Sequence, residues 1–289
     1  MSNKNNNNNN NTCLFITGNC NSKCTYCYAP TFYITEKEKN AKFKKNIQNV
    51  DQAIKIGANS FVITGGEPLL YKDLFKLLAY IKANNCSVYL NTNAILFNNK
   101  TILKILKYVD ILGLPLDSLD PKVNTKLGRQ KSYQKVIDFL KEYEENQYYD
   151  QIKLKIATVA TSINLKSIPE LMEIIPAKAD LWKIYQFCQR GRGEKNKNLL
   201  NINLKEFNQL KKTIKAKNPS IKIVFATEKS INFSNFLIIP SGKVLIPSPR
   251  GYQILGYLND KLTQKKIQEV WNNPNYQANL RRTYLLKDS

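Results

Sequence analysis

Histidine is absent from all 289 residues of the sequence. Its absence excludes a histidine general base and every zinc site of mixed Cys/His composition. Methionine and tryptophan are scarce, with two of each, and no apolar run approaches the roughly 18–20 residues that a membrane-spanning helix needs. The amino terminus has neither the basic nor the apolar region of a signal peptide. We therefore expect a cytoplasmic protein with no membrane partner.

Acidic residues are also few: 22 Asp and Glu stand against 44 Lys and Arg, which gives a net charge of +22. A basic surface attracts the phosphate of nucleotides, RNA or anionic membranes. The basic residues are spread over most of the chain, however, and Lys, Asn and Ile are abundant throughout. A compositional bias explains the charge as well as a function does, so it gives nucleic-acid binding only weak support.

Apolar strand-like runs alternate with amphipathic helical patterns after an Asn-rich tail, residues 1–12, which we expect to be disordered. The predicted strands are 13–17, 60–64, 86–91, 110–116, 152–160 and 181–187. The predicted helices between them are 36–58, 72–83, 100–108, 133–145 and 165–175. Because parallel neighbours need crossover connections, this order predicts an α/β fold, a partial (β/α)6 barrel over residues 13–190.

The pattern changes after residue 190. Helices are predicted at 203–217 and 264–272, with short strands at 221–226, 236–240 and 243–247 between them. Ser241-Gly242 is typical of the turn of a hairpin. We therefore expect residues 191–289 to form a small C-terminal α+β extension.

Three of the six cysteines lie in one C-x3-C-x2-C motif, Cys20, Cys24 and Cys27, directly after the first predicted strand. Ligands gather outside the carboxyl ends of parallel strands, and long loops there tend to be functional. A [4Fe–4S] cluster usually takes four thiolates, so three leave one iron open for another ligand. The alternative is a structural zinc ion closed by Cys13. That cysteine lies seven residues upstream within a strand, which is awkward for a fourth ligand.

The second predicted strand ends in Thr64-Gly65-Gly66-Glu67-Pro68. Adjacent glycines let the backbone approach a ligand closely because they have no Cβ. Glu67 offers a carboxylate acceptor that suits an ammonium group. A plain strand-to-helix turn would explain Pro68 but not the doubled glycine.

In this order and on these strands, the two motifs resemble those of the radical SAM superfamily. There C-x3-C-x2-C holds a [4Fe–4S] cluster, S-adenosylmethionine (SAM) chelates the open iron, and a GGEP-type turn receives the methionine amino group. The resemblance covers about residues 13–190. It implies that the cluster ligands are Cys20, Cys24 and Cys27 and that SAM lies beside Gly65, Gly66, Glu67 and Pro68.

Further stretches follow the same family order. Asn91 and Asn93, after the third strand, resemble a polar turn near the cofactor, and Asp117 and Ser118, after the fourth, stand where relatives place polar groups near the ribose or carboxylate. Residues 116–129, LDSLDPKVNTKLGR, resemble viperin-type enzymes. That match implies that Arg129 binds the SAM carboxylate, for which bidentate geometry is suited.

Two features of this stretch leave questions open. Pro115 stands where viperin-type enzymes have a serine that touches SAM, so that contact is lost or replaced. Capping of a helix or turn is an equal alternative for Asp117 and Asp120.

The exit of the sixth strand resembles two groups of enzymes. Its Trp-Lys-x-aromatic-Gln run, residues 182–186, resembles viperins, whereas Gly191-Arg192-Gly193 resembles peptide-modifying maturases. Arg190 and Arg192 suit a clamp for an anionic substrate, with solvated loop arginines as the alternative. The extension resembles that of SPASM/twitch-type maturases but contains no cysteine, which argues against auxiliary clusters. The remaining cysteines are then core thiols: Cys13, Cys86 and Cys188.

The resemblance implies an enzyme that cleaves SAM reductively to a 5′-deoxyadenosyl radical, which then abstracts hydrogen from a substrate. No catalytic side chain is assigned. The substrate is either a small anionic metabolite, such as a nucleotide in the viperin manner, or a peptide. A non-catalytic metal-binding or RNA-associated protein is the third hypothesis. The implied protein partner is a one-electron donor such as ferredoxin or flavodoxin.

Overall fold

The computed structural model describes residues 10–30, 42–217, 219–231, 236–249, 251–274 and 276–277. Most of the tail predicted at 1–12 and the first part of the helix predicted at 36–58 lie outside the described residues.

Six parallel strands form the centre of one curved sheet, in chain order from β1 to β6. They are β1 (Asn11–Phe15), β2 (Ser60–Thr64), β3 (Ser87–Asn91), β4 (Ile111–Pro115), β5 (Lys153–Ala160) and β6 (Leu181–Gln186). The predicted α/β partial barrel is therefore confirmed.

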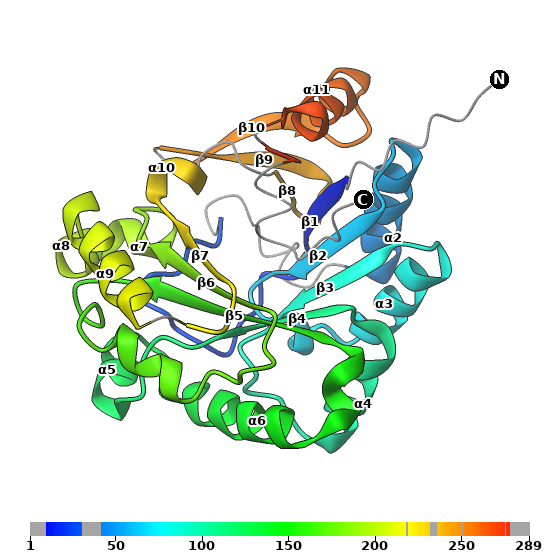
Figure 1. The fold of residues 1–289 in the computed structure, drawn as a ribbon. Helices are drawn as coiled ribbons and strands as arrows, with labels where there is room; N and C mark the ends of the chain where they lie inside the picture. Colours follow the sequence, from blue (N-terminus) through cyan, green and yellow to red (C-terminus); the bar gives the residue numbers. More distant parts are fainter. Residues whose placement is uncertain are drawn as a thin grey trace.

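Helices cover the convex side of this sheet (Figure 1). They are α2 (Phe43–Lys55), α3 (Leu74–Ala83), α4 (Asn99–Tyr108) and α6 (Tyr133–Glu145). On α6, Val136, Phe139, Leu140 and Tyr143 are buried at the spacing of one helix face, which is why this stretch packs as a helix on the sheet. The helix predicted at 165–175 is instead a short 3-10 helix, η4 (Ile168–Glu173), whose first turn contains a proline.

Three further short elements complete the barrel connections. They are η2 (Pro68–Leu70), α5 (Pro121–Lys126) and η3 (Gln147–Gln151). The sequence patterns did not predict α5. Asp120 caps it by accepting a hydrogen bond from Lys122 N at 2.7 Å, which confirms the capping alternative for this residue.

Residues after 190 extend the same sheet at both edges. β7 (Ile223–Ala226) pairs in parallel with β6, and β8 (Leu237–Ile238) pairs in parallel with β1. β9 (Lys243–Ser248) and β10 (Gly251–Tyr257) then continue antiparallel beyond β8. The helices of this part are α7 (Arg192–Lys195), α8 (Lys197–Leu200), α9 (Leu204–Ala216), α10 (Glu228–Ile231) and α11 (Lys261–Asn272).

The concave side of the sheet has a smaller core of its own. Cys13, Val62, Tyr89 and Ile111 are register partners on β1 to β4, and they cluster with buried residues of the extension such as Leu245. Because paired residues of a sheet point to the same face, the register defines which side chains line the inside of the barrel.

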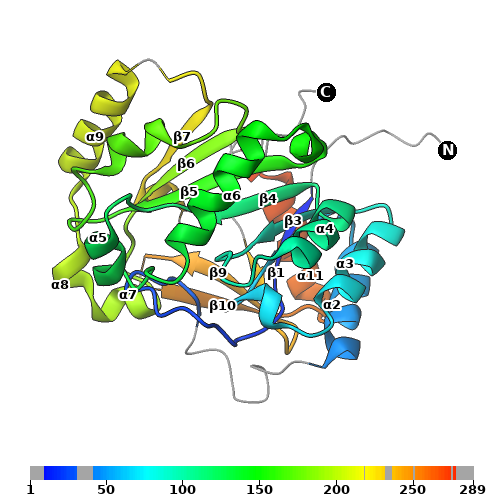
Figure 2. The same cartoon turned by 90° about the horizontal axis from the view of Figure 1, so that it is seen from below.

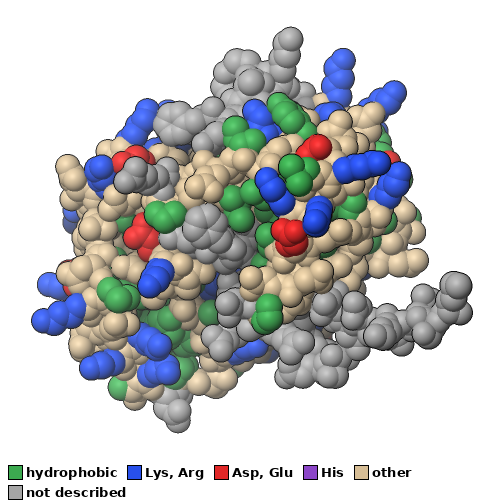
Figure 3. All heavy atoms as spheres, turned by 90° about the horizontal axis from the view of Figure 1, so that it is seen from above, with side chains coloured by type: hydrophobic (Ala, Val, Ile, Leu, Met, Phe, Trp, Pro, Cys, Tyr) green, Lys and Arg blue, Asp and Glu red, His purple; other side chains and the backbone are tan. Residues whose placement is uncertain are grey.

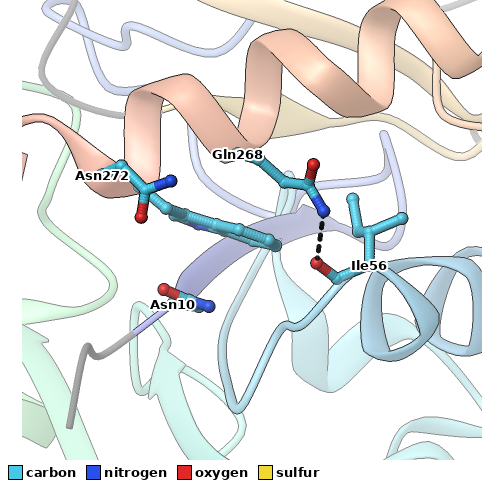
Figure 4. A pocket seen from close by; sticks show the side chains of 5 residues that line it. Asn10, Ile56, Gln268 and Asn272 are labelled. Atoms are coloured by element: carbon cyan, nitrogen blue, oxygen red, sulfur yellow. Dashed lines mark hydrogen bonds between the residues drawn. The ribbon is translucent and has the colours of Figure 1, made fainter. Parts of the chain in front are cut away.

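The amino end of β1 is closed by the last described residues. Trp271 Nε1 and Tyr276 Oη both donate to Asn11 O, at 3.1 and 2.9 Å. A cavity of about 210 Å³ lies here, lined by Asn10, Ile56, Gln268, Trp271 and Asn272 (Figure 4). It is at the opposite end of β1 from the cysteine loop, so it is separate from the predicted site.

Candidate functional site

The cysteine loop, residues 18–30, leaves the carboxyl end of β1 and is held first by the turn after β2. Gly66 N donates to Thr17 O and Glu67 N to Asn19 O, both at 2.7 Å. A Cβ on Gly66 would lie 2.2 Å from Asn19 O. The doubled glycine therefore permits a close approach, and the group that approaches is the backbone of the cysteine loop, whereas the sequence suggested a ligand.

The segment after α5 holds the loop from another side. Thr25 N donates to Leu127 O at 3.1 Å, and Ser22 Oγ donates to Gly128 O at 3.1 Å. Gly128 has a φ of +73°, and a Cβ there would lie 2.4 Å from Lys23 O. Only glycine fits this position, because the backbone conformation and the space both exclude a side chain.

The three thiols of the loop differ in exposure: Cys20 is exposed, Cys24 buried and Cys27 intermediate. Burial raises the pKa of Cys27, while Arg192 and Arg129 lower it. Among the described residues no three His, Cys, Asp or Glu side chains come close enough to ligate a single metal ion. A cubane binds each thiolate at a different iron, so its ligands stand further apart, and an all-sulfur donor set suits it.

Glu67 lies at the centre of the turn after β2, with 1% of its surface exposed. Its carboxylate accepts hydrogen bonds from Thr92 Oγ1 at 2.6 Å, Asn93 N at 2.7 Å and Leu69 N at 3.0 Å. Burial raises the pKa of this carboxyl group, and the three donors lower it. The structure thus joins Gly65–Pro68 directly to the predicted polar turn after β3.

The two asparagines of that turn have different surroundings. Asn93 Nδ2 donates to Asn21 Oδ1 at 2.8 Å, which ties the turn to the cysteine loop. Asn91 stands on the inner face of β3, in register with Gly113 on β4. A Cβ on Gly113 would lie 2.2 Å from Asn91 Oδ1. Gly113, which sequence reasoning missed, therefore leaves the space that Asn91 occupies.

Asp117, Arg129 and Tyr26 form one buried network between β4 and the cysteine loop. Tyr26 Oη donates to Asp117 Oδ2. Arg129 Nε donates to Tyr26 Oη at 2.6 Å and lies 3.3 Å from Asp117 Oδ2. Asp117 Oδ1 accepts from Val159 N at 2.9 Å, so this carboxylate is not a helix cap. Next to it, Ser118 is fully buried and its Oγ accepts from Asp120 N.

The inside of the barrel carries two buried lysines. Lys155 on β5 is the register partner of Gly113, and Lys183 on β6 is the partner of Ala157, two residues further along the same face. Each is 6% exposed. Burial lowers the pKa of Lys155 to about 8. It lowers the pKa of Lys183 well below its usual value, and the neighbouring charge of Lys155 lowers it further.

Sequence reasoning singled out only the run that contains Lys183. The signal for Lys155 was present, since Lys153 and Lys155 interrupt the apolar run of β5 at alternate positions, and alternate residues of a strand share one face.

The predicted clamp of Arg190 and Arg192 is not what the structure shows. Arg190 is 3% exposed, and its Nε donates to Ser248 O at 3.1 Å. Arg192 Nη1 donates to Cys24 O at 3.1 Å. The chain turns back at Gly191, so these side chains point into the protein rather than to a substrate in solution.

Basic side chains are scattered over the face drawn in Figure 3, among apolar and neutral ones, and form no single band. In the described part of the chain, no helix has the length and hydropathy needed to cross a bilayer.

Comparisons with known proteins identify the family of this chain. The radical SAM superfamily profile matches residues 14–175, more than half of the chain. The chain belongs to the radical SAM superfamily, and it is an enzyme of that class.

Among individual relatives, an S-adenosylmethionine-dependent nucleotide dehydratase of Flammeovirga pacifica is 22% identical over 267 residues, 88% of each chain. An uncharacterised protein of Methanocaldococcus jannaschii is 31% identical over 269 residues, 86% of this chain and 88% of that one. A probable GTP 3′,8-cyclase of the same archaeon is 29% identical over 181 residues, 60% of this chain and 57% of the cyclase.

Among solved structures, Streptococcus suis SuiB bound to the precursor peptide SuiA has a TM-score of 0.69 at 21% identity, and the match covers 96% of this chain and 68% of that one. The structure of anSMEcpe with bound AdoMet has a TM-score of 0.62 at 15% identity over 95% of this chain and 83% of that one. At these identities the similarity establishes the fold, including that of the extension.

Proposed function

We propose that this enzyme binds a [4Fe–4S] cluster at Cys20, Cys24 and Cys27 and acts on a small phosphorylated substrate, of the nucleoside triphosphate class, inside the barrel. With both bound, the cluster and SAM supply reductive cleavage of SAM and a 5′-deoxyadenosyl radical that removes hydrogen from the substrate. The proposed SAM contacts are Gly65, Gly66, Glu67, Pro68, Asn91, Asn93, Asp117, Ser118 and Arg129.

The described contacts support this arrangement at the carboxyl ends of the strands. Glu67 is held by three donors and keeps a carboxylate beside the loop of thiols, where it can accept from an ammonium group. Arg129 lies within a network that also contains Tyr26 of the cysteine loop. Groups held in this way are positioned before the cofactor binds, which limits the cost of ordering them.

The observation that carries the substrate assignment is the pair of buried lysines, Lys155 and Lys183. A buried ammonium group is costly unless an anion or hydrogen-bond acceptors compensate it. Burial lowers the pKa of both groups and so disfavours their charged form. Anionic phosphate oxygens inside the barrel would stabilise the charged form, while the apolar inner core around Tyr89 and Ile111 keeps water from the reacting atoms.

The names of two relatives also support a nucleotide substrate, since one is a nucleotide dehydratase and the other a probable GTP cyclase. The second candidate substrate is a peptide. The fold favours this candidate. SuiB, which was solved with its precursor peptide, matches 96% of this chain, including the extension.

The test is anaerobic reconstitution with iron and sulfide, followed by measurement of 5′-deoxyadenosine release with a chemical reductant. Ribonucleoside triphosphates should raise release above the uncoupled rate. Lys155→Gln and Lys183→Gln should each weaken that response about 10- to 100-fold, because a hydrogen bond to a charged group contributes about 1.5–3 kcal/mol. Lys212→Gln, which removes an exposed lysine of α9, is the control. If peptides raise 5′-deoxyadenosine release and nucleotides do not, the substrate is the second candidate, a peptide.

A further inference from the structure

The chain that leaves β6 turns back across the cysteine loop. Gly191 has a φ of +56°, and a Cβ on it would lie 2.7 Å from Cys27 O and 2.6 Å from Ala29 O. Two backbones therefore meet at a distance that only glycine permits. Figure 2 shows α7 and α8 beside the dark blue segment that contains the loop.

Three carbonyl groups of the loop accept hydrogen bonds from this segment. Arg192 N donates to Cys27 O at 2.8 Å, and Arg192 Nη1 donates to Cys24 O at 3.1 Å. Asn196 Nδ2 donates to Thr25 O at 2.9 Å. These bonds fix the backbone at two of the three cysteines, Cys24 and Cys27.

The same contact brings a positive charge to the thiols. The guanidinium group of Arg192 donates a hydrogen bond to the backbone of Cys24, and the backbone N of the same arginine donates to Cys27 O. A cation next to sulfur ligands stabilises the more negative, reduced form of an iron–sulfur cluster. Charge and hydrogen bonds around the sulfurs are the protein's means of setting the cluster's reduction potential.

We infer that Gly191–Asn196 is a support of the cluster site, in which Arg192 positions the cysteine loop and raises the reduction potential of the cluster. Arg192 is thus a positioning residue, and it serves neither the substrate nor SAM directly. The inference rests on cluster ligation by the three cysteines, and it is independent of which substrate the enzyme uses.

The experiment is a redox titration of the reconstituted full-length protein, followed by electron paramagnetic resonance, without SAM or substrate. Arg192→Gln should keep its iron and sulfide and shift the midpoint potential to a more negative value. Arg192→Lys retains the charge and should shift it less. Lys197→Gln removes a positive charge just after this segment, but the Lys197 side chain is 47% exposed. Solvent screens an exposed charge, so the potential of this variant should equal that of the wild type.

Asn196→Ala separates support from charge, because it removes the bond to Thr25 O and no charge. It should lose cluster faster on dilution into chelator while its potential stays unchanged. An Arg192→Gln protein that holds its cluster at the wild-type potential would overturn the inference, and Arg192→Met, which also removes the charge, decides the matter in the same way if the glutamine variant does not fold. A wild-type protein that takes up no cluster would overturn both this inference and the cysteine assignment, whereas wild-type cluster with no nucleotide response would affect only the substrate proposal.

Discussion

Arg129 Nε lies 2.6 Å from Tyr26 Oη, which joins a residue proposed to bind SAM to the middle of the cysteine motif. Tyr26 also donates to Asp117, and its ring lies 5.6 Å from the guanidinium carbon of Arg129. One hydroxyl group therefore connects the cysteine loop with Asp117 and Arg129, two of the charged residues that follow β4. Removing this hydroxyl group breaks the connection without removing a charge.

Tyr26→Phe should accordingly keep its iron and sulfide and bind SAM about 10- to 100-fold more weakly, because a hydrogen bond to a charged group contributes about 1.5–3 kcal/mol. Equilibrium binding of SAM to the reconstituted protein measures this, with cluster content determined on the same sample. Tyr148→Phe is the matched control, since Tyr148 is half exposed. Unchanged SAM affinity in Tyr26→Phe would show that the network does not position Arg129.

The six cysteines divide into two groups with different expected effects. Replacement of Cys20, Cys24 or Cys27 by Ala should abolish the cluster absorbance and reduce iron and sulfide to the background, because a cluster with one iron reserved for SAM has no thiolate to lose. Cys86→Ala should retain both, since Cys86 is a buried core residue between α3 and β3. Retention of a full cluster in Cys24→Ala, or its loss in Cys86→Ala, would contradict the assignment.

Lys155→Met should stabilise the protein at pH 7. The folded-state pKa of about 8, against 10.5 for an ordinary lysine, corresponds to a cost on the order of 3 kcal/mol for burying the charge. The unfolded chain binds more protons than the folded protein between these two values, so wild-type stability rises with pH across this window. The advantage of the variant should therefore be largest below pH 8 and shrink as the pH approaches 10.5.

Urea unfolding of both proteins at pH 7 and pH 9.5 measures that difference. Other groups that titrate in this range are common to both chains and cancel in the comparison, except Lys183, whose pKa the charge of Lys155 lowers. The same variant should lose most of the nucleotide response, so stability and function change in opposite directions. A variant that is less stable than the wild type at pH 7 would show that Lys155 is fully compensated inside the folded protein.

Local patterns were enough to predict much of the fold. The apolar run at 60–64 and the helical spacing at 133–145 reproduce β2 and α6 with the same bounds. Shorter or proline-containing elements were harder: α5 has only six residues, and η4 contains a proline in its first turn. The placement of β7 beside β6 and of β8 beside β1 depends on pairing between distant segments, which local periodicity does not encode.

The site shows the same division. The motifs predicted which strand ends carry the chemistry, because parallel strands bring their carboxyl ends to one edge. They did not predict which groups contact each other: the role of Arg192 depends on a chain that returns 168 residues after Cys24. Gly113 was missed because a single glycine in a strand forms no sequence pattern. Its effect is to leave space for the side chain of Asn91 on the neighbouring strand.

Gly113→Ala provides a test of that last relationship. The new Cβ would lie 2.2 Å from Asn91 Oδ1, and the end of an asparagine side chain can rotate away. The cost in stability should therefore stay within about 1 kcal/mol. Asn91, however, is displaced from the row that it shares with Gly113 and Lys155, so SAM should bind more weakly even though the variant unfolds at nearly the wild-type temperature.

A double-mutant cycle tests whether Gly113→Ala weakens SAM binding by displacing Asn91. Asn91→Ala alone should weaken SAM binding about as much as Gly113→Ala does, and the double variant should bind no more weakly than Asn91→Ala, because the displaced group is already gone. Additive losses in the double variant would mean that the new methyl group acts on the site by another path. Wild-type affinity in both single variants would remove Asn91 from the proposed SAM contacts.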